Sequence, residues 1–271
     1  MRIQKNDLKT LIESKSPGFF RKLPGFASHA LLRTFEKIVH ADELSAFFAL
    51  HGDKTQWEFI EAVFAYLNFT YIVDDAARQH IPAAGRLICV ANHATGPLDG
   101  LILLHLIGAV RQDVKIVLTD LLAGLDNLAA LFLVYDQYAT RLQKQNIQAI
   151  RQALLAEQAV IFFPAGEVTK LTWRGLREKP WQPGPVSLAR KYAAPILPVK
   201  LQARNSWLYY LVSRLHRHLG TMLLAHEMFG KRACTVPVAV GELLSATEFT
   251  AAQNDVYAQS QQLREQVRQL R

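Results

Sequence analysis

The N-terminal part of the chain has a helical pattern of apolar positions. From Leu8 to about Asp75, apolar residues recur at spacings of three and four, the period of an amphipathic helix. Proline and glycine at positions 17, 18, 24 and 25 interrupt the pattern early. Residues 1–78 are therefore predicted to form an N-terminal helical extension. Its apolar faces are expected to pack on the rest of the protein rather than on a membrane.

After residue 78, short apolar runs alternate with helical stretches. The runs are typical of buried parallel strands, which are apolar on both faces. They cover 85–91, 114–118, 159–163, 196–201 and 235–240. The helical stretches cover 98–106, 121–132, 144–157 and 187–192. This alternation predicts an α/β layered domain over residues 79–245, with a mostly parallel central sheet flanked by helices.

Two further helices are predicted toward the C-terminus. Leu208 to Met228 combines an apolar face with a basic rim, which suits either a surface-seeking helix or a core helix with a solvated edge. Ala251 to Leu270 is polar and rich in glutamine. Residues 246–271 are therefore predicted to end the chain as a helix that faces solvent or a partner.

Charge and composition narrow the possible partners. The formal net charge of +8 favours anionic partners, and either nucleic acid or an anionic lipid surface would fit. The chain has no zinc module, aromatic RNA-binding run or lysine-rich tail, so we predict a membrane surface and no nucleic acid. No stretch reaches the roughly 18 apolar residues of a spanning helix, so membrane contact is predicted to be peripheral.

The cysteines and the N-terminus indicate the compartment. Cys89 and Cys234 both lie in apolar, strand-like runs, where a small buried thiol is common, and they form neither a disulfide framework nor a metal set. Residues 1–10 are basic and polar without the apolar segment of a secretory signal. We expect a cytoplasmic protein, peripheral to the inner face of the cell membrane, without a metal or cofactor.

The sharpest local feature is a loop between a predicted buried strand and a helix. It contains His93, and Asp99 follows in the first turn of the helix. In open α/β sheets, ligands gather at the carboxyl ends of strands. Asp99 could orient the imidazole so that its other nitrogen acts as a general base. Thr95 is the one nearby hydroxyl, so direct attack by a substrate alcohol or amine is simpler than a covalent enzyme intermediate.

A second cluster, Phe163-Pro164-Ala165-Gly166-Glu167, also leaves a predicted strand. Pro164 and Gly166 shape a turn, and Gly166 would allow close backbone approach to a ligand or an oxyanion. Basic residues follow at positions 170, 174, 177 and 179. They could hold a phosphate or a phosphopantetheine group, or form a solvated loop.

Three blocks together resemble the lysophospholipid acyltransferase superfamily. They are Asn92-His93 with Asp99-Gly100, Phe163-Pro164-Ala165-Gly166-Glu167, and Ile196-Leu197-Pro198-Val199. Their order and approximate spacing are similar to the family's first, third and fourth blocks over residues 80–245. The branch that the chain resembles most is the hemolysin-like one, which has lyso-ornithine-lipid acyltransferases among its relatives.

The resemblance implies a glycerol-phosphate-acyltransferase-like fold and an activity. The reaction would move an acyl chain from acyl-carrier protein or coenzyme A to a lysolipid, with His93 as general base and Asp99 as its orienter. Asn92, Thr95, Gly96, Pro164, Gly166 and Glu167 would contact substrate, and Arg141 would be the family's phosphate-binding arginine.

Two positions depart from the commoner family pattern and leave alternatives open. Five residues, rather than four, separate His93 from Asp99, so the Gly96-Pro97 turn must absorb one residue. Ala165 stands where glutamate is usual. A lipid-binding or scaffolding protein without turnover is therefore one alternative. A thioesterase or lipase is another, although the chain lacks the Gly-x-Ser-x-Gly elbow of such enzymes.

Overall fold

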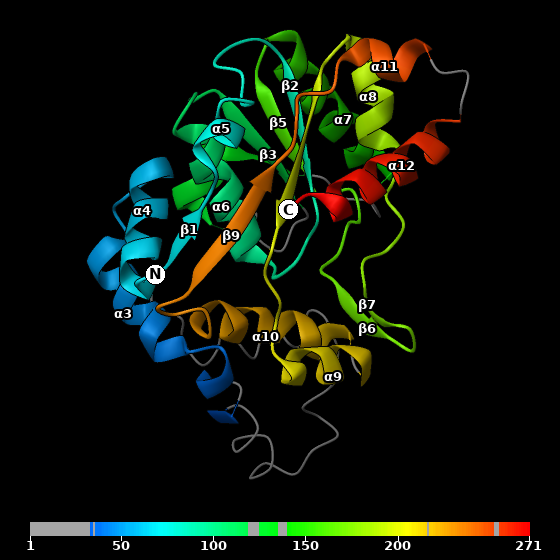
Figure 1. Cartoon of the computed structure of the whole chain (residues 1–271). Helices are drawn as coiled ribbons and strands as arrows, with labels where there is room; N and C mark the ends of the chain where they lie inside the picture. The colour runs from blue at the N-terminus through cyan, green and yellow to red at the C-terminus, as the bar shows by residue number, and fades with distance from the viewer. Residues whose placement is uncertain (1–32, 35, 119–124, 135–139, 216, 252–254) are drawn as a thin grey trace.

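A mostly parallel sheet forms the centre of the protein (Figure 1). The computed structural model describes residues 33, 34, 36–118, 125–134, 140–215, 217–251 and 255–271. In these residues, seven strands pair in the order β1-β9-β8-β2-β5-β3-β4. Their bounds are β1 Thr70–Ile72, β2 Leu87–Ala91, β3 Val114–Leu118, β4 Phe132–Val134, β5 Ala159–Phe162, β8 Ile196–Leu201 and β9 Thr235–Val240. Strands β8, β2, β5, β3 and β4 are parallel, and β9 pairs antiparallel with β8.

Helices cover both faces of the sheet. The α-helices are α3 Ala41–His51, α4 Gln56–Leu67, α5 Asp75–Arg78, α6 Pro97–Gly108, α7 Thr140–Leu155, α8 Gly184–Tyr192, α9 Trp207–Leu215, α10 Arg217–Phe229, α11 Ala246–Ala251 and α12 Val256–Gln269. Helices α4 and α6 contribute to one core cluster, whereas α7, α8 and α12 contribute to another. Figure 1 shows the two groups on opposite sides of the strands. The predicted α/β layered fold is confirmed.

Strand β2 shows why the central strands read as uninterrupted apolar runs. All five of its residues are buried, because β8 and β5 flank its edges and a helical layer covers each face. Side chains alternate across a strand, so Cys89 enters one core cluster and Val90 the other. Burial raises the pKa of the Cys89 thiol strongly, which keeps it protonated.

The structure corrects three details of the predicted elements. The helical stretch that was expected to reach Asp75 ends in α4, and β1 follows it as an edge strand parallel to β9. The predicted helix 208–228 is two helices, α9 and α10. The C-terminal helix, predicted to face solvent or a partner, instead buries Leu263 and Val267 of α12 in the core.

Other predicted elements are described only in part. The predicted stretch 121–132 overlaps residues 119–124, which lie outside the described part, and continues as a 3₁₀ helix at Asp126–Leu131 before β4. Residues 8–32 of the predicted N-terminal helices also lie outside it. The boundaries of the predicted extension and C-terminal segment stay predictions.

The elements next to the predicted site lie together at one end of the molecule. Figure 1 shows α9, α10 and a small hairpin together, at the end opposite α11. The hairpin consists of β6 Lys170–Thr172 and β7 Gly175–Arg177. Within the described part of the chain, every helix is too short or too polar to span a membrane.

Candidate active site

The loop between β2 and α6 carries the first predicted motif. Asn92 anchors its start, because its side chain accepts a hydrogen bond from the Leu201 backbone N–H at 2.8 Å and donates one to the Leu201 carbonyl at 3.0 Å. The loop ends at Gly96, whose backbone φ of 111° is one that residues other than glycine rarely adopt. Pro97 then begins α6, a position where its missing N–H costs no helical hydrogen bond.

His93 and Asp99 meet directly despite the longer spacing. His93 Nδ1 lies 2.8 Å from Asp99 Oδ2. The Asp99 side chain is fully buried, whereas that of His93 is 19% exposed. A carboxylate only accepts hydrogen bonds, so this contact places the imidazole hydrogen on Nδ1 and leaves the Nε2 lone pair free to take a proton. The contact that the sequence predicts between the two side chains is present.

Asp99 is fixed by further donors at the start of α6. Its Oδ2 accepts from the backbone N–H groups of Thr95 at 2.7 Å and Gly96 at 3.0 Å, and its Oδ1 accepts from the Thr95 hydroxyl at 2.5 Å. A carboxylate in the first helical turn also interacts favourably with the helix dipole. The carboxylate therefore has one available position, and the imidazole must align to it.

Two residues that the sequence reasoning missed as site residues hold His93 from other sides. The ring of Phe163 stacks on the imidazole with 4.2 Å between centroids and 15° between planes. Glu178 accepts a hydrogen bond from the His93 backbone N–H at 2.8 Å and another from Trp181 Nε1 at 2.9 Å. Burial raises the pKa of the Glu178 carboxyl more than its hydrogen bonds lower it. Nothing local in the sequence marks Glu178, because it lies 85 residues from His93.

The second predicted cluster forms a turn next to His93, at the end of β5. The Gly166 N–H donates to the Phe163 carbonyl at 3.0 Å, and Gly166 adopts a φ of 68°. Gly166 is exposed, and a Cβ there would meet no atom within 4 Å, so open space adjoins the turn. Pro164 is buried, and its carbonyl accepts from the Gln182 N–H.

The charges beyond this turn are partly paired. Glu167 lies 2.7 Å from Lys170 Nζ and 3.0 Å from Lys179 Nζ. Burial acts to raise the pKa of Glu167, but hydrogen bonds and attraction from both ammonium groups outweigh it and lower that pKa. Arg174 instead lies over the Trp173 ring, at 4.1 Å from its centroid. Of the predicted basic cluster, Lys170 and Lys179 thus pair with Glu167, whereas Arg174 lies at the tip of the hairpin.

Two further residues complete the map of the predicted site. Arg141 lies in α7, and its side chain is outside the described part. Tyr209 of α9 is buried, and burial, followed by the charge interactions of nearby groups including Asp99, raises the pKa of its phenol. Tyr209 therefore stays neutral and able to donate a hydrogen bond.

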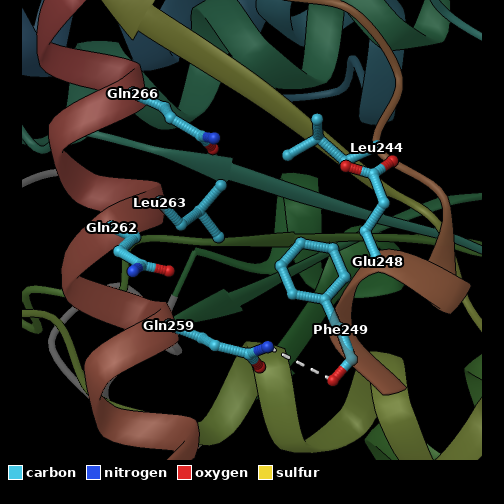
Figure 2. A pocket seen from close by; sticks show the side chains of 7 residues that line it. All are labelled: Leu244, Glu248, Phe249, Gln259, Gln262, Leu263 and Gln266. Atoms are coloured by element: carbon cyan, nitrogen blue, oxygen red, sulfur yellow. Dashed lines mark hydrogen bonds between the residues drawn. The ribbon is translucent and has the colours of Figure 1, made fainter. Parts of the chain in front are cut away.

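A separate hollow lies between α11 and α12 (Figure 2). It measures about 160 Å³, below the 300 Å³ or more of ordinary ligand pockets. Leu244 in its wall pairs with Ile196 at the beginning of β8, whereas His93 follows the end of the parallel strand β2. The hollow and His93 thus belong to opposite ends of the sheet. Among the described residues, no three His, Cys, Asp or Glu side chains are placed to share a metal ion.

Comparison with known proteins decides the family. The family model described as Acyltransferase matches residues 10–271. The chain belongs to this acyltransferase family. The structure of the acyltransferase is similar to the 1-acyl-sn-glycerophosphate (LPA) acyltransferase PlsC from Thermotoga maritima, with a TM-score of 0.51, 14% identity, and 79% of this chain and 80% of that chain covered. This likeness confirms the predicted fold.

Two relatives bear the same descriptive name. The acyltransferase is 26% identical to the lyso-glycine lipid O-acyltransferase of Bacteroides thetaiotaomicron over 243 residues, which cover 87% of each chain. It is 24% identical to the lyso-glycine lipid O-acyltransferase of Phocaeicola vulgatus, with 87% of this chain and 85% of the relative covered. With the family match and the fold, they confirm the resemblance to the lysophospholipid acyltransferase superfamily.

Proposed function

We propose that this acyltransferase moves an acyl chain from an acyl thioester to a hydroxyl of a lysolipid, with His93 as general base. The observation that carries the proposal is the 2.8 Å contact between His93 Nδ1 and the buried Asp99. It orients the ring and keeps its hydrogen on Nδ1, so that Nε2 is the proton acceptor. Stacking on Phe163 and the Glu178 contact to the His93 backbone support the same orientation.

The reaction proceeds by direct attack. The acceptor hydroxyl gives its proton to His93 Nε2 as its oxygen bonds to the thioester carbonyl carbon. The resulting tetrahedral oxyanion collapses, the carbon–sulfur bond breaks, and the leaving thiolate takes the proton back from the imidazolium. The products are an ester and a free thiol. The Thr95 hydroxyl already donates to Asp99 inside the protein, which argues against a covalent intermediate on that side chain.

The names of the relatives support a lysolipid acceptor and an ester product. We assign acceptor contact to the turn of Pro164, Gly166 and Glu167, because open space adjoins Gly166. Asn92, Thr95 and Gly96 act through the shape of the loop. The side chains of Asn92 and Thr95 are already engaged in internal hydrogen bonds. Arg141 stays our candidate for an anionic group of the substrate.

A product analysis tests the activity. The purified full chain is incubated with acyl-coenzyme A or acyl-carrier protein and with a panel that includes lyso-glycine lipid and lysophosphatidic acid. Products are identified by mass. We expect at least one acceptor to gain an acyl chain with at least one donor. A thioester that stays intact with every acceptor would favour the lipid-binding alternative. Fatty acid released at the same rate without acceptor would favour a thioesterase.

We place the enzyme at the inner face of the cell membrane as a peripheral protein. The net charge of +8 and the lipid acceptor support this location. After cell fractionation, we expect the protein in the membrane pellet and its release by high salt or alkaline carbonate. Complete recovery in the soluble fraction at low salt would contradict this placement.

A further inference from the structure

Large apolar side chains are exposed together at the end of the molecule that carries the site. In α9, Trp207, Leu208, Leu211 and Leu215 are exposed, with 85% of Leu215 accessible. Trp173 lies at the turn of the β6–β7 hairpin and is 78% exposed. An isolated exposed leucine is ordinary, but a group of this size marks an interaction surface. We call these five residues the apolar end.

Helix α9 has two distinct faces. Trp207, Leu211 and Leu215 follow one another at intervals of four residues, which places them on one side of the helix. Tyr209 and Tyr210 on the other side are buried in a cluster with Val168 and Leu223. The helix is therefore held to the protein by one face, while Trp207, Leu211 and Leu215 on the opposite face are exposed. The Trp207 ring contacts Tyr210 of the same helix edge-on.

Basic side chains outnumber acidic ones around the apolar end. Residues 168–179 and 203–215, which include the hairpin and α9, contain six Lys and Arg residues and a single acidic residue. The basic residues are Lys170, Arg174, Arg177, Lys179, Arg204 and Arg214. The acidic residue is Glu178, whose carboxylate is engaged internally with His93 and Trp181. Glu167, just before the first range, pairs with Lys170 and Lys179, so the excess positive charge comes from the four arginines. Arg174, Arg177, Arg204 and Arg214 are exposed.

The two elements that carry the apolar end are hydrogen-bonded to the loop that contains His93. Thr169, just before β6, donates two hydrogen bonds to the His93 carbonyl, from its N–H at 2.8 Å and its hydroxyl at 3.1 Å. Asn205, just before α9, donates to the Thr95 carbonyl at 3.2 Å. The first residues of the hairpin and of α9 are therefore fixed to the loop that contains His93.

We propose that the apolar end, which α9 and the tip of the β6–β7 hairpin carry, inserts into the interfacial layer of an anionic membrane. Tryptophan and leucine side chains enter the boundary between headgroups and acyl chains, and the arginines bind lipid phosphates. The charge selects an anionic bilayer over a protein partner of mixed charge. The inference rests on the proposed function, because the purpose of membrane insertion would be to bring a lysolipid from the bilayer to His93.

Matched variants of the full chain test this surface. The apolar variant combines Trp173→Ala, Trp207→Ser, Leu211→Ser and Leu215→Ser. The charge variant combines Arg174→Glu and Arg214→Glu. The control variant combines Leu50→Ser and Leu155→Ser, which change leucines of α3 and α7 that are 69% and 51% exposed. Far-ultraviolet circular dichroism and the melting temperature check that each variant is folded.

Binding is measured by flotation with vesicles of phosphatidylcholine alone or with phosphatidylglycerol. We expect the parent and the control variant to bind the anionic vesicles. The apolar variant should bind them about tenfold more weakly or worse, because its inserting side chains are removed. The charge variant should lose only its preference for anionic vesicles. High salt should weaken parent binding, because the screening length falls from about 10 Å at 0.1 M to about 3 Å at 1 M.

Activity separates this inference from the proposed function. With a short-chain acceptor that dissolves as monomers, the apolar variant should turn over like the parent, whereas with acceptor in vesicles it should be slower. Parent binding without acyl transfer would contradict the proposed function and leave the surface standing. Equal vesicle binding by the parent and a folded apolar variant would overturn the inference. So would a parent dimer that the apolar variant loses while vesicle binding is unchanged, because a second copy would then cover this face.

Discussion

Replacing Asp99 by asparagine isolates the role of the orienter. The carboxylate is fully buried and accepts four hydrogen bonds among the described residues. Asparagine keeps the shape, and its oxygen can replace Oδ2, but the charge is lost. A hydrogen bond to a charged group contributes about 1 kcal/mol more than a neutral one, so the three bonds on Oδ2 would lose about 3 kcal/mol. The burial cost of the charge is also relieved, which offsets part of this loss.

We therefore expect Asp99→Asn to lower the free energy of unfolding by about 1–3 kcal/mol, less than the 5–15 kcal/mol of an ordinary domain. The variant should stay folded at 25 °C. The rate of acyl transfer should fall much further, by about 10²–10⁴, because the neutral amide no longer stabilises the imidazolium that forms when Nε2 takes the proton. Urea denaturation gives the first quantity, and thioester consumption at saturating acceptor gives the second.

Thr95→Val is the matched control for this experiment. It removes the hydroxyl contact to Asp99 Oδ1 but leaves the contact between His93 and Asp99 in place. We expect a loss of about 1.5–3 kcal/mol of stability, because a buried carboxylate oxygen loses this donor, and a rate that stays close to that of the parent. The reasoning is refuted if Asp99→Asn transfers acyl chains at the parent rate, or if Thr95→Val is as slow as Asp99→Asn.

Three further substitutions have defined outcomes. Gly96→Ala places a Cβ on a backbone with a φ of 111°, only 3.0 Å from Leu224 Cδ2. It should lower the free energy of unfolding by about 1–3 kcal/mol, and an unchanged melting temperature would contradict this. Glu178→Ala removes the acceptor of two partly buried donors, the His93 N–H and Trp181 Nε1–H. It should lower the free energy of unfolding in urea by about 2–4 kcal/mol, and parental stability would contradict this. Burial lowers the pKa of His105 in the folded protein below its ordinary value of 6.5, so at lower pH the unfolded chain binds more protons than the folded one. Stability should therefore decrease as the pH is lowered below about 6.5. His105→Phe should make this decrease shallower in thermal melts, and an equally steep decrease in both proteins would exclude His105 as its cause.

The sequence predicts the centre of the fold well because burial leaves a local signature there. Strands such as β2 are covered on both faces, so each is an unbroken apolar run. Strand β1 left no such signature, because it has three residues at the sheet edge and pairs with β9 about 165 positions away. The buried face of α12 contains two polar residues, Gln259 and Ser260, beside Leu263 and Val267, so apolar spacing did not reveal it.

The candidate site divides in the same way. His93 and Asp99 belong to one loop and one helical turn, so their contact could be anticipated from local geometry. The turn at Gly166 was visible because proline and glycine mark it. The contacts of Phe163 and Glu178 with His93 depend on how strands and loops assemble in three dimensions, and a single sequence contains no local pattern for them.

The most direct test of the central claim is the single-turnover rate of acyl transfer by His93→Ala. Labelled acyl thioester is mixed with a molar excess of enzyme and a saturating lysolipid acceptor, and the acylated product is followed by mass. If His93 Nε2 removes the acceptor proton, the variant should bind both substrates and form product about 10²–10⁴ times more slowly than the parent. A folded His93→Ala protein that forms the same product at the parent rate would contradict the account.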